Sequence, residues 1–194
     1  MVSKTREKFI EVARQLFARK GIENTTMNDI ASASDKGRRT IYTYFKSKRD
    51  IFNAVIERET DKVLASLKLI VSQPGEPEEK LRQYVECRFE IVKSIVLRNG
   101  SLKAGFFRDV RKVDRARKIV SGKETELLKQ ILEQGVEQGV FTIDDIPSRA
   151  IIIIHALQGL DVPYIRDSLA SQDISKSKLI GYVSDLILNG IKHH

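Results

Sequence analysis

The chain has 194 residues, of which 41% are hydrophobic and 31% are charged. This balance is sufficient for a buried core and excludes an intrinsically disordered chain. The longest apolar run, residues 150–154, is far shorter than the roughly 18 residues that indicate a membrane-spanning helix. The charged first residues lack the apolar segment of a signal peptide, and a single cysteine, Cys87, excludes an intrachain disulfide. We therefore expect a cytoplasmic protein.

The net charge of +8 is unevenly distributed along the chain. Residues 1–50 contain 12 lysines and arginines against 6 aspartates and glutamates, whereas residues 51–194 contain 22 against 20. A basic N-terminal quarter on a nearly neutral body indicates a polyanionic partner at one end of the molecule. Composition alone is compatible with DNA, RNA or an anionic membrane surface.

The first part of the chain predicts two helices. Apolar residues at helical spacing predict the first over residues 3–20, and they are Phe9, Ala13, Leu16 and Phe17. Gly21 follows a basic last turn and is typical of a helix C-terminal cap. Thr26 and Asp29 have the spacing of a capping box, which predicts that a short helix covers about residues 27–34.

Two further helices follow a tight turn. Asp35-Lys36-Gly37 interrupts the helical pattern before a short helix over about residues 38–45. The side chains that bury this helix are Ile41 and Phe45. Ser47 and Asp50 repeat the capping pattern and open a long helix. The face that we expect it to bury consists of Phe52, Ile56, Val63, Leu67 and Ile70. Two short helices joined by a tight glycine-containing turn, between longer helices, predict a helix-turn-helix unit.

The rest of the chain predicts only helices. Pro74-Gly75-Glu76-Pro77 is the clearest break, and it places Pro77 at a helix start. Apolar periodicity then marks five helices, over about residues 77–98, 101–111, 120–139, 147–161 and 175–191. The run Ile151–Ile154 has the composition of a buried strand, but we favour a helix because no second strand is available to pair with it.

These elements predict an all-α fold with two domains. A three-helix helix-turn-helix DNA-binding domain covers residues 1–47, and a helical regulatory domain covers residues 48–194. The helix over residues 48–71 connects them.

The second short helix of a helix-turn-helix lies in the DNA major groove. The side chains directed outward from it are Arg38, Arg39, Thr40, Tyr42, Thr43 and Tyr44. Arginine matches O6 and N7 of guanine, and threonine can hydrogen-bond to a base or contact a thymine methyl group. Tyrosine hydroxyls, Lys46 and Lys48 suit phosphates, as do the backbone N–H groups of the helices that begin near Thr26 and Ser47. The alternative is a merely solvated basic face; two arginines beside two outward tyrosines favour DNA binding.

A set of short segments within about residues 5–60 is specific in combination. They are Ala13–Phe17, Gly21, Thr25-Thr26, Ile30-Ala31 and Thr40–Lys48. Together they resemble the N-terminal signature of the TetR (tetracycline-repressor-like) family. The resemblance implies that Thr26, Tyr44 and Lys48 contact phosphates. It also implies that five residues lie at or near bases, namely Arg38, Arg39, Thr40, Tyr42 and Thr43.

The resemblance further implies a repressor that a small-molecule ligand releases from a palindromic operator. It also implies that the C-terminal domain holds an inducer pocket between its middle helices. This sequence departs from the family pattern in the turn, where Asp35-Lys36-Gly37 replaces the usual Gly-Val-Ser, and in having Arg39 where many members have glycine. We therefore hypothesise that each half-site contains a guanine read by Arg38 or Arg39.

The candidates for the ligand pocket are Tyr84, Cys87, Arg88, Phe106, Phe107 and His155. Arg88 falls on the apolar side of its helix, where it either anchors an anionic ligand or, as we favour, pairs with a carboxylate or reaches water. His155 is more readily explained as a hydrogen-bonded core residue than as a ligand contact. Cys87 is best explained as a small buried hydrophobic residue, and a redox role is left open.

The last two predicted helices are apolar on two sides, which indicates a homodimer interface. On the helix over residues 147–161 one face carries Ile151, His155 and Gln158, and another carries Ile154, Leu157 and Asp161. On the last helix one stripe contains Leu179, Tyr182, Val183 and Leu186, and a second contains Ile180, Ile187 and Ile191. The alternative is that both helices are fully buried within one subunit.

The sequence argues against an enzyme. It contains three histidines, two of them terminal, and it lacks paired metal-ligand spacing, a phosphate-binding glycine loop and a nucleophile motif. We therefore expect no metal and no cofactor. The partners we expect are double-stranded DNA, a second copy of the chain and a small-molecule effector, without a membrane. A non-specific architectural DNA-binding protein is the alternative function.

Overall fold

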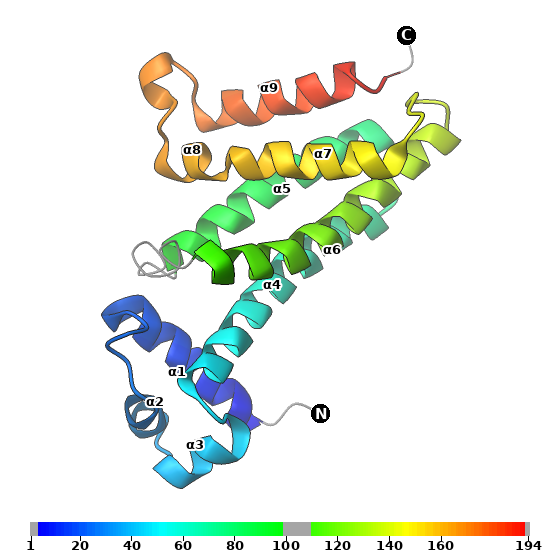
Figure 1. Cartoon of the computed structure of the whole chain (residues 1–194). Coiled ribbons are helices and arrows are strands. Elements are labelled where there is room, and N and C mark those ends of the chain that lie inside the picture. The colour runs from blue at the N-terminus through cyan, green and yellow to red at the C-terminus, as the bar shows by residue number, and fades with distance from the viewer. Residues whose placement is uncertain (1–3, 99–109, 193–194) are drawn as a thin grey trace. The chain divides into compact units, whose positions relative to one another are not determined.

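A computed structural model describes the backbone of residues 4–98 and 110–192, and the side chains of residues 4–98 and 121–192. Every regular element in these ranges is a helix (Figure 1). In chain order they are α1 (Lys4–Lys20), α2 (Met27–Ala33), α3 (Arg38–Tyr44), α4 (Lys48–Ser72), α5 (Pro77–Arg98), α6 (Val110–Glu137), α7 (Ile146–Gly159), α8 (Asp161–Arg166), the 3-10 turn η2 (Ala170–Gln172) and α9 (Lys176–Asn189). The all-α prediction is confirmed. Most of the helix expected over residues 101–111 lies outside the described residues.

The chain divides into two compact units. Unit 1 contains residues 1–61 and 95–116, and unit 2 contains residues 62–94 and 117–194. Three helices, α4, α5 and α6, therefore continue from one unit into the other without a loop at the division. The first turns of α4 belong to the same compact unit as the helix-turn-helix.

Unit 1 has an apolar core between α1, α2, α3 and the start of α4. Its buried members are Phe9, Ile10, Ala13, Leu16, Phe17, Ile30, Ala31, Ile41, Phe45, Ile51, Ala54 and Val55. The predicted stripe of α1 and the two predicted anchors of α3, Ile41 and Phe45, are all among them. Because both short helices bury a side chain in this core, their exposed sides are held at a fixed angle to each other.

Two capping boxes form where the sequence predicts them. The Thr26 hydroxyl accepts a hydrogen bond from Asp29 N (3.1 Å), and Asp29 Oδ2 accepts one from Thr26 N (2.9 Å). At the start of α4, Ser47 Oγ accepts from Asp50 N (3.2 Å) and Asp50 Oδ2 accepts from Ser47 N (3.1 Å). Both helix starts are therefore determined by side chains within four residues of each other.

The turn between α2 and α3 differs from the expected glycine turn. Asp35 adopts the left-handed conformation with φ 53°, whereas Gly37 has φ −66° and is the N-cap of α3. Lys8 holds Asp35 by an ion pair of 2.9 Å. Aspartate tolerates the left-handed region better than most residues, which allows this position to turn the chain without glycine.

The prediction of which face α4 buries is wrong for the first half of the helix. In that half Ile51, Ala54 and Val55 are buried, while Phe52 and Ile56 are only partly buried. Further along, Val63 and Leu67 are buried as predicted and Ile70 is partly buried. The cause is that α4 packs first in unit 1 and then in unit 2, so one continuous stripe does not describe it.

Unit 2 buries apolar side chains from α5, α6, α7 and α9. They include Leu81, Val85, Phe89, Leu128, Ile131, Leu132, Ile153, Ile154, Leu157, Leu179 and Leu188. After α6 the chain folds tightly back, because Val140 N and Phe141 N both donate to Gly135 O. A Cβ on Gly135 would lie 1.9 Å from the Phe141 ring, so the residue at 135 must be glycine for this packing.

The sequence did not reveal α8, a helix of six residues in the segment expected to be a loop between α7 and α9. Its Tyr164 is buried and stacks on Phe89 of α5, with ring centroids 4.9 Å apart. A single turn or two of helix is too short to show a 3.6-residue period, which is why apolar spacing did not predict it. The strand alternative for residues 151–154 is excluded, because they lie within α7.

Candidate nucleic-acid interface and regulatory residues

The outward side of α3 contains the residues that the sequence assigned to DNA. Arg38, Arg39, Tyr42, Thr43 and Tyr44 are exposed, and Thr40 is partly buried. On the opposite side, Ile41 is completely buried. The structure therefore brings all six candidates to the accessible part of one short helix, and their contacts with DNA stay a prediction.

The side chains of α3 differ in how far contacts within the protein already engage them. The Arg38 guanidinium lies 5.9 Å from the centroid of the Tyr42 ring, within cation–π range. The Thr43 hydroxyl donates to Thr40 O (2.7 Å), so its proton is already in use. In contrast, the Arg39 side chain has no hydrogen-bond or ion-pair partner among the described residues and is exposed. Arg39 therefore keeps its full set of donors for an outside acceptor.

The ring of Tyr44 packs against a ring of the apolar core. It lies 5.9 Å from that of Phe9, in a tilted arrangement, although the residue as a whole is exposed. A ring that rests on the core has a restricted direction, which suits a hydroxyl that marks a fixed position on a DNA backbone. Lys46, which follows α3, is exposed.

Lys48 is held more closely than the sequence suggested. Its ammonium donates to the carbonyl oxygens of Ile22 (2.7 Å) and Glu23 (3.3 Å), which ties the start of α4 to the loop after α1. The backbone N–H groups of Lys46 and Ser47 both donate to Asp50 Oδ2. The lysine and the N–H groups that suit a phosphate thus already have acceptors, and a phosphate at this point must share or replace them.

At the start of α2, Thr26 is exposed and its hydroxyl and N–H are both used in the capping box. Hydrogen bonds from Thr26 lower the pKa of Asp29, so the capping carboxylate stays charged at neutral pH. This negative charge lies beside a proposed phosphate contact. The hydroxyl and the N–H of Thr26 are both engaged with Asp29, so a phosphate at this point must share or replace these bonds.

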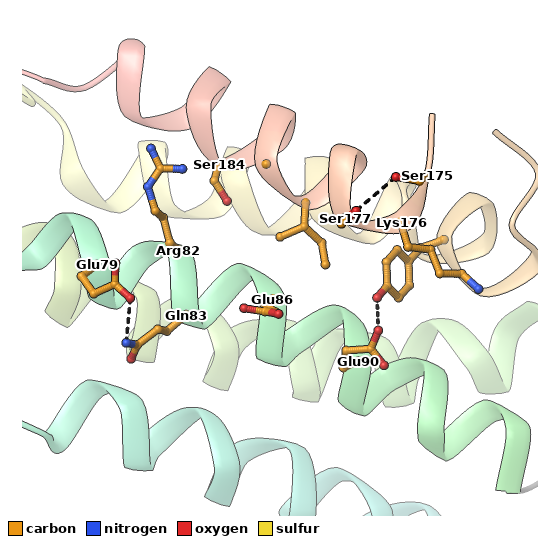
Figure 2. A pocket seen from close by; sticks show the side chains of 12 residues that line it. Glu79, Arg82, Gln83, Glu86, Glu90, Ser175, Lys176, Ser177 and Ser184 are labelled. Carbon is orange, nitrogen blue, oxygen red and sulfur yellow. Dashed lines mark hydrogen bonds between the residues drawn. The ribbon is translucent and has the colours of Figure 1, made fainter. Parts of the chain in front are cut away.

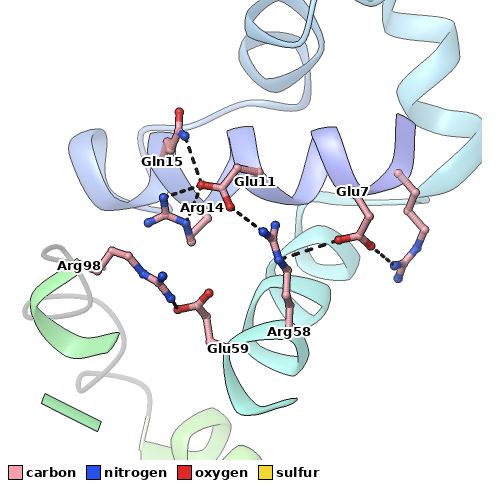
Figure 3. A network of polar contacts seen from close by, with 8 residues as sticks. Glu7, Glu11, Arg14, Gln15, Arg58, Glu59 and Arg98 are labelled. Atoms are coloured by element: carbon pink, nitrogen blue, oxygen red, sulfur yellow. Dashed lines mark hydrogen bonds and ion pairs between the residues drawn. The ribbon is translucent and has the colours of Figure 1, made fainter. Parts of the chain in front are cut away.

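An ion-pair network joins α1 to α4 beneath the helix-turn-helix (Figure 3). Glu11 pairs with Arg14 (2.6 Å) and with Arg58 (3.0 Å), and Arg58 also reaches Glu7 (3.9 Å). The hydrogen bond from Arg14 is the largest cause that lowers the pKa of Glu11, to about 2. The i, i+3 spacing of Glu11 and Arg14 was readable in the sequence, but their link to α4 was not.

A second contact joins α4 to the end of α5 within unit 1. The carboxylate of Glu59 is almost completely buried and accepts a short hydrogen bond from Arg98 (Figure 3). Sequence reasoning missed this pair, because its members lie on different helices 39 positions apart. A buried carboxylate requires such a partner.

Two of the pocket candidates, Tyr84 and Arg88, are buried and already bonded. The Tyr84 hydroxyl donates to Glu124 O (2.9 Å), and burial raises its pKa well above the ordinary value. Arg88 is 2% exposed and forms a fork with Asp161, with distances of 2.7 and 3.2 Å. Its Nε lies 3.3 Å from Glu124 Oε1. The favoured prediction, that Arg88 pairs with a carboxylate, is confirmed.

The other pocket candidates are placed differently. Cys87 is partly buried, and burial raises the pKa of its thiol, which keeps it protonated. His155 is exposed on α7, so the expectation of a core histidine is wrong. Phe106 and Phe107 lie outside the described residues. Burial raises the pKa of Glu124, and the positive charge of Arg88, the next largest cause, opposes this effect.

An apolar surface lies on α7 and α9, which run along each other in Figures 1 and 2. Its large side chains are Ile151, Ile152, Tyr182 and Leu186. Leu186 is 76% exposed and Ile152 is 62% exposed. The opposite sides of the same helices are buried through Ile154, Leu157 and Leu188. The alternative that both helices are fully covered within one subunit is therefore wrong for the part of the chain that the structure describes.

The described residues contain no group of three or more His, Cys, Asp or Glu side chains that could hold a metal ion. None of the described helices is long and apolar enough to cross a bilayer.

Comparison with known proteins relates the chain to bacterial regulators. Residues 9–55 match the family "Bacterial regulatory proteins, tetR family". The chain is 26% identical over 179 residues to the probable acrEF/envCD operon repressor of Escherichia coli (strain K12), covering 89% of this chain and 81% of the relative. It is 24% identical over 204 residues to the transcriptional repressor NicS of Pseudomonas putida, covering 97% and 93%.

A solved structure has the same fold over almost the whole chain. The transcriptional regulator from Cytophaga hutchinsonii ATCC 33406 superposes with a TM-score of 0.75 at 26% identity, covering 96% of this chain and 98% of that one. The family match coincides with the compact core of α1 to α3 and the start of α4, which carries the candidate DNA contacts.

Proposed function

The chain belongs to the tetR family of bacterial regulatory proteins and is a DNA-binding transcriptional regulator; from this premise we propose that it represses transcription as a homodimer on a palindromic operator, until a small molecule binds unit 2. Two relatives along most of its length are repressors. We further propose that it acts in the cytoplasm and has no catalytic activity of its own.

The observation that carries the proposal is the outward side of α3. It presents Arg38 and Arg39 beside threonine and tyrosine side chains, and Arg39 has no partner among the described residues. A free guanidinium at the N-terminal end of a recognition helix is suited to O6 and N7 of guanine. We assign Arg38, Arg39, Thr40, Tyr42 and Thr43 to the bases.

The phosphate contacts fall on the residues that flank these base readers. We assign Thr26, Tyr44, Lys46 and Lys48 to the DNA backbone, where they fix the position of α3 without reading sequence. Lys48 supports the site in a second way, because its bonds to Ile22 and Glu23 connect the start of α4 to the loop before α2.

We propose that the apolar surface of α7 and α9 pairs with the same surface of a second copy. A two-fold contact buries Leu186 and Ile152 of both copies and gives each helix its second apolar neighbour. Successive major grooves on one side of DNA lie about 34–36 Å apart, so the dimer must hold its two α3 helices at that separation.

Release by a ligand requires that the ligand favour a subunit arrangement with another separation of the α3 helices. α4 is suited to transmit this change. It has 25 residues, a length of about 37 Å, and begins within the unit that holds α3 and ends in unit 2.

Selection of binding sites from random DNA tests the proposal. The wild-type chain should select a palindrome with a guanine in each half-site. Arg39→Ala should lose preference at one position per half-site, worth about 1–3 kcal/mol. Arg19→Ala is the matched control, because it removes the same charge from an exposed position on α1. Selection of no common sequence by the wild type, or an unchanged preference in Arg39→Ala, would contradict the assignment.

A further inference from the structure

A groove with a volume of about 740 Å³ lies between α5 and α9, entirely within unit 2 (Figure 2). None of the residues that the sequence assigned to a ligand pocket lines it. Carboxylates line its α5 side, and hydroxyls and an isoleucine line its α9 side.

The carboxylates form a row along α5. Glu79, Glu86 and Glu90 all line the groove, and they are separated by seven and then four positions. At the helical rise of 1.5 Å per residue, these separations correspond to about 10 Å and 6 Å along the axis. The groove therefore presents negative charges in a line.

The cations at the groove are already paired with acidic groups. Arg82 binds Asp185 (2.8 Å), and Lys176 lies 3.8 Å from Asp167. Neither aspartate lines the groove, so both cations are balanced from outside it. Lys176 still acts electrostatically on Glu90, whereas neither of the two cations pairs with Glu79 or Glu86.

The three carboxylates differ in how far they are engaged. Glu90 accepts a hydrogen bond from the Tyr164 hydroxyl and pairs with Lys93 (3.0 Å), and Glu79 accepts one from the Gln83 amide (2.9 Å). Glu86 is exposed, and the described residues offer its carboxylate no ion pair or hydrogen bond. Glu86 is therefore the strongest remaining acceptor in the row.

The second and independent observation is Ser184 on α9. It is 1% exposed, and its Oγ has no hydrogen-bond partner within the described part of the chain. It lines the groove, and Figure 2 shows its side chain projecting from α9 toward α5. Leaving a buried hydroxyl unpaired costs stability, so a ligand group that bonds to it gains that energy on binding.

We propose that this groove binds a linear aliphatic polyamine, with one ammonium group at Glu86, a second toward Glu90 or Glu79, and a polar N–H donating to Ser184 Oγ. Ammonium groups separated by three or four methylenes match the spacing of Glu86 and Glu90. The methylenes between them lie against Ile180, which is the apolar residue of the α9 side. Ammonium donors bonded to carboxylates make strong, charge-assisted hydrogen bonds.

This proposal rests on the proposed function only for its consequence, that the polyamine is an effector. Binding itself is tested on the full chain without DNA, by isothermal titration with spermidine at physiological ionic strength. We expect saturable binding with one site per chain, and much weaker binding of butylamine, which has a single ammonium group. Equal binding of butylamine or of Mg²⁺, or no saturation with spermidine, would overturn the proposal.

Two variants locate the site. Glu86→Gln should weaken spermidine binding about tenfold, because it removes a charged acceptor. Glu137→Gln is the matched control, an exposed glutamate near the end of α6 that does not line the groove, and it should bind like the wild type. Equal affinities in the two variants would overturn the assignment.

Ser184→Ala separates a binding role from a structural one. Since its hydroxyl has no partner, the alanine variant should unfold at the same or a higher denaturant concentration than the wild type, yet bind spermidine several-fold more weakly. Loss of stability with unchanged binding would contradict the role of Ser184.

Operator affinity is measured in a separate experiment. The Glu86→Gln protein is its control, because spermidine still binds to the DNA in that sample but binds weakly to the groove. If spermidine fills the groove without changing operator affinity, the groove proposal holds and release by this ligand is refuted.

Discussion

Replacing Arg88 by methionine should destabilise the protein in a manner that depends steeply on pH. The change keeps most of the side chain but leaves two carboxylates without their cation, namely Glu124, which is 1% exposed, and Asp161, which Arg88 holds in a fork. The expected pH dependence is that of Glu124, the more deeply buried of the two. A buried carboxyl in that position takes up a proton. Since pH 7 lies 2.5 pH units above the ordinary pKa of 4.5, this protonation costs about 3.4 kcal/mol at about 1.36 kcal/mol per unit. The value agrees with the 3–5 kcal/mol that is typical of breaking a buried ion pair.

The sign of the pH dependence follows from the direction of the pKa. In the folded variant the pKa of Glu124 lies above its value in the unfolded chain, so the folded state binds the extra proton. Stability is then highest at low pH and is lost as the pH rises past 4.5. The cost of the substitution should accordingly fall to about 0.7 kcal/mol at pH 5.

Urea unfolding at several pH values and one fixed protein concentration measures this effect. Adding Glu124→Gln to Arg88→Met should recover the part of the loss that comes from Glu124, together with its pH dependence, whereas Asp161 still lacks its cation. Arg82→Met is the matched control on α5, because its exposed pair with Asp185 contributes at most about 1 kcal/mol. A cost for Arg88→Met that is small, or that stays constant between pH 5 and 7, would refute the reasoning and reopen a ligand-binding role for Arg88.

Three other substitutions test separate parts of the structure. Gly135→Ala should lower the free energy of unfolding by about 1–3 kcal/mol, because its Cβ displaces the buried Phe141 ring, and Phe141→Ala should cost less in that background than in the wild type; a stabilised Gly135→Ala would contradict this packing. Leu186→Glu should convert the dimer to monomers in analytical ultracentrifugation without loss of helical circular dichroism, whereas an unchanged mass would place the interface elsewhere. Thr26→Ala should cost about 1 kcal/mol in urea unfolding through loss of the cap, and a neutral result would show that Asp29 alone maintains the start of α2.

The features of the fold that were predictable from sequence are local ones. The capping residues of α2 and α4 lie within four positions of one another, so their chemistry is visible in the chain. The apolar stripe of α1 repeats at the helical period, and the proline-glycine break before α5 needs no tertiary information. The exposed face of α3 followed from two buried anchors, Ile41 and Phe45, on a helix of two turns.

The features that the sequence could not specify depend on contacts between distant residues. Asp161 lies 73 positions from Arg88, at the end of the helix predicted over residues 147–161, and nothing local shows that the two side chains meet. Nothing local shows that the carbonyl of Ile22 lies beside Lys48, so this bond could not be predicted in addition to the proposed phosphate contact. His155 looked like a core residue because its neighbours in the chain are apolar, but it lies on the side of α7 that carries the exposed Ile151 and Ile152.

A polyamine effector constrains how repression can be relieved. Its positive charges are attracted to DNA and to the carboxylates of α5, but not to the arginines of α3, so it cannot act by occupying the base-reading residues. Any effect on operator affinity beyond that of spermidine bound to the DNA must therefore pass through the protein. α5 is the element that can transmit it, because Glu86 faces the groove while Arg88 is buried in the core of unit 2. The same helix ends at Arg98, which holds the buried Glu59 of α4. A ligand that displaces α5 therefore changes the support of α4 at that contact. We expect Arg98→Glu and Glu59→Arg each to weaken the response of operator affinity to spermidine. The double variant that exchanges the two charges should preserve operator binding.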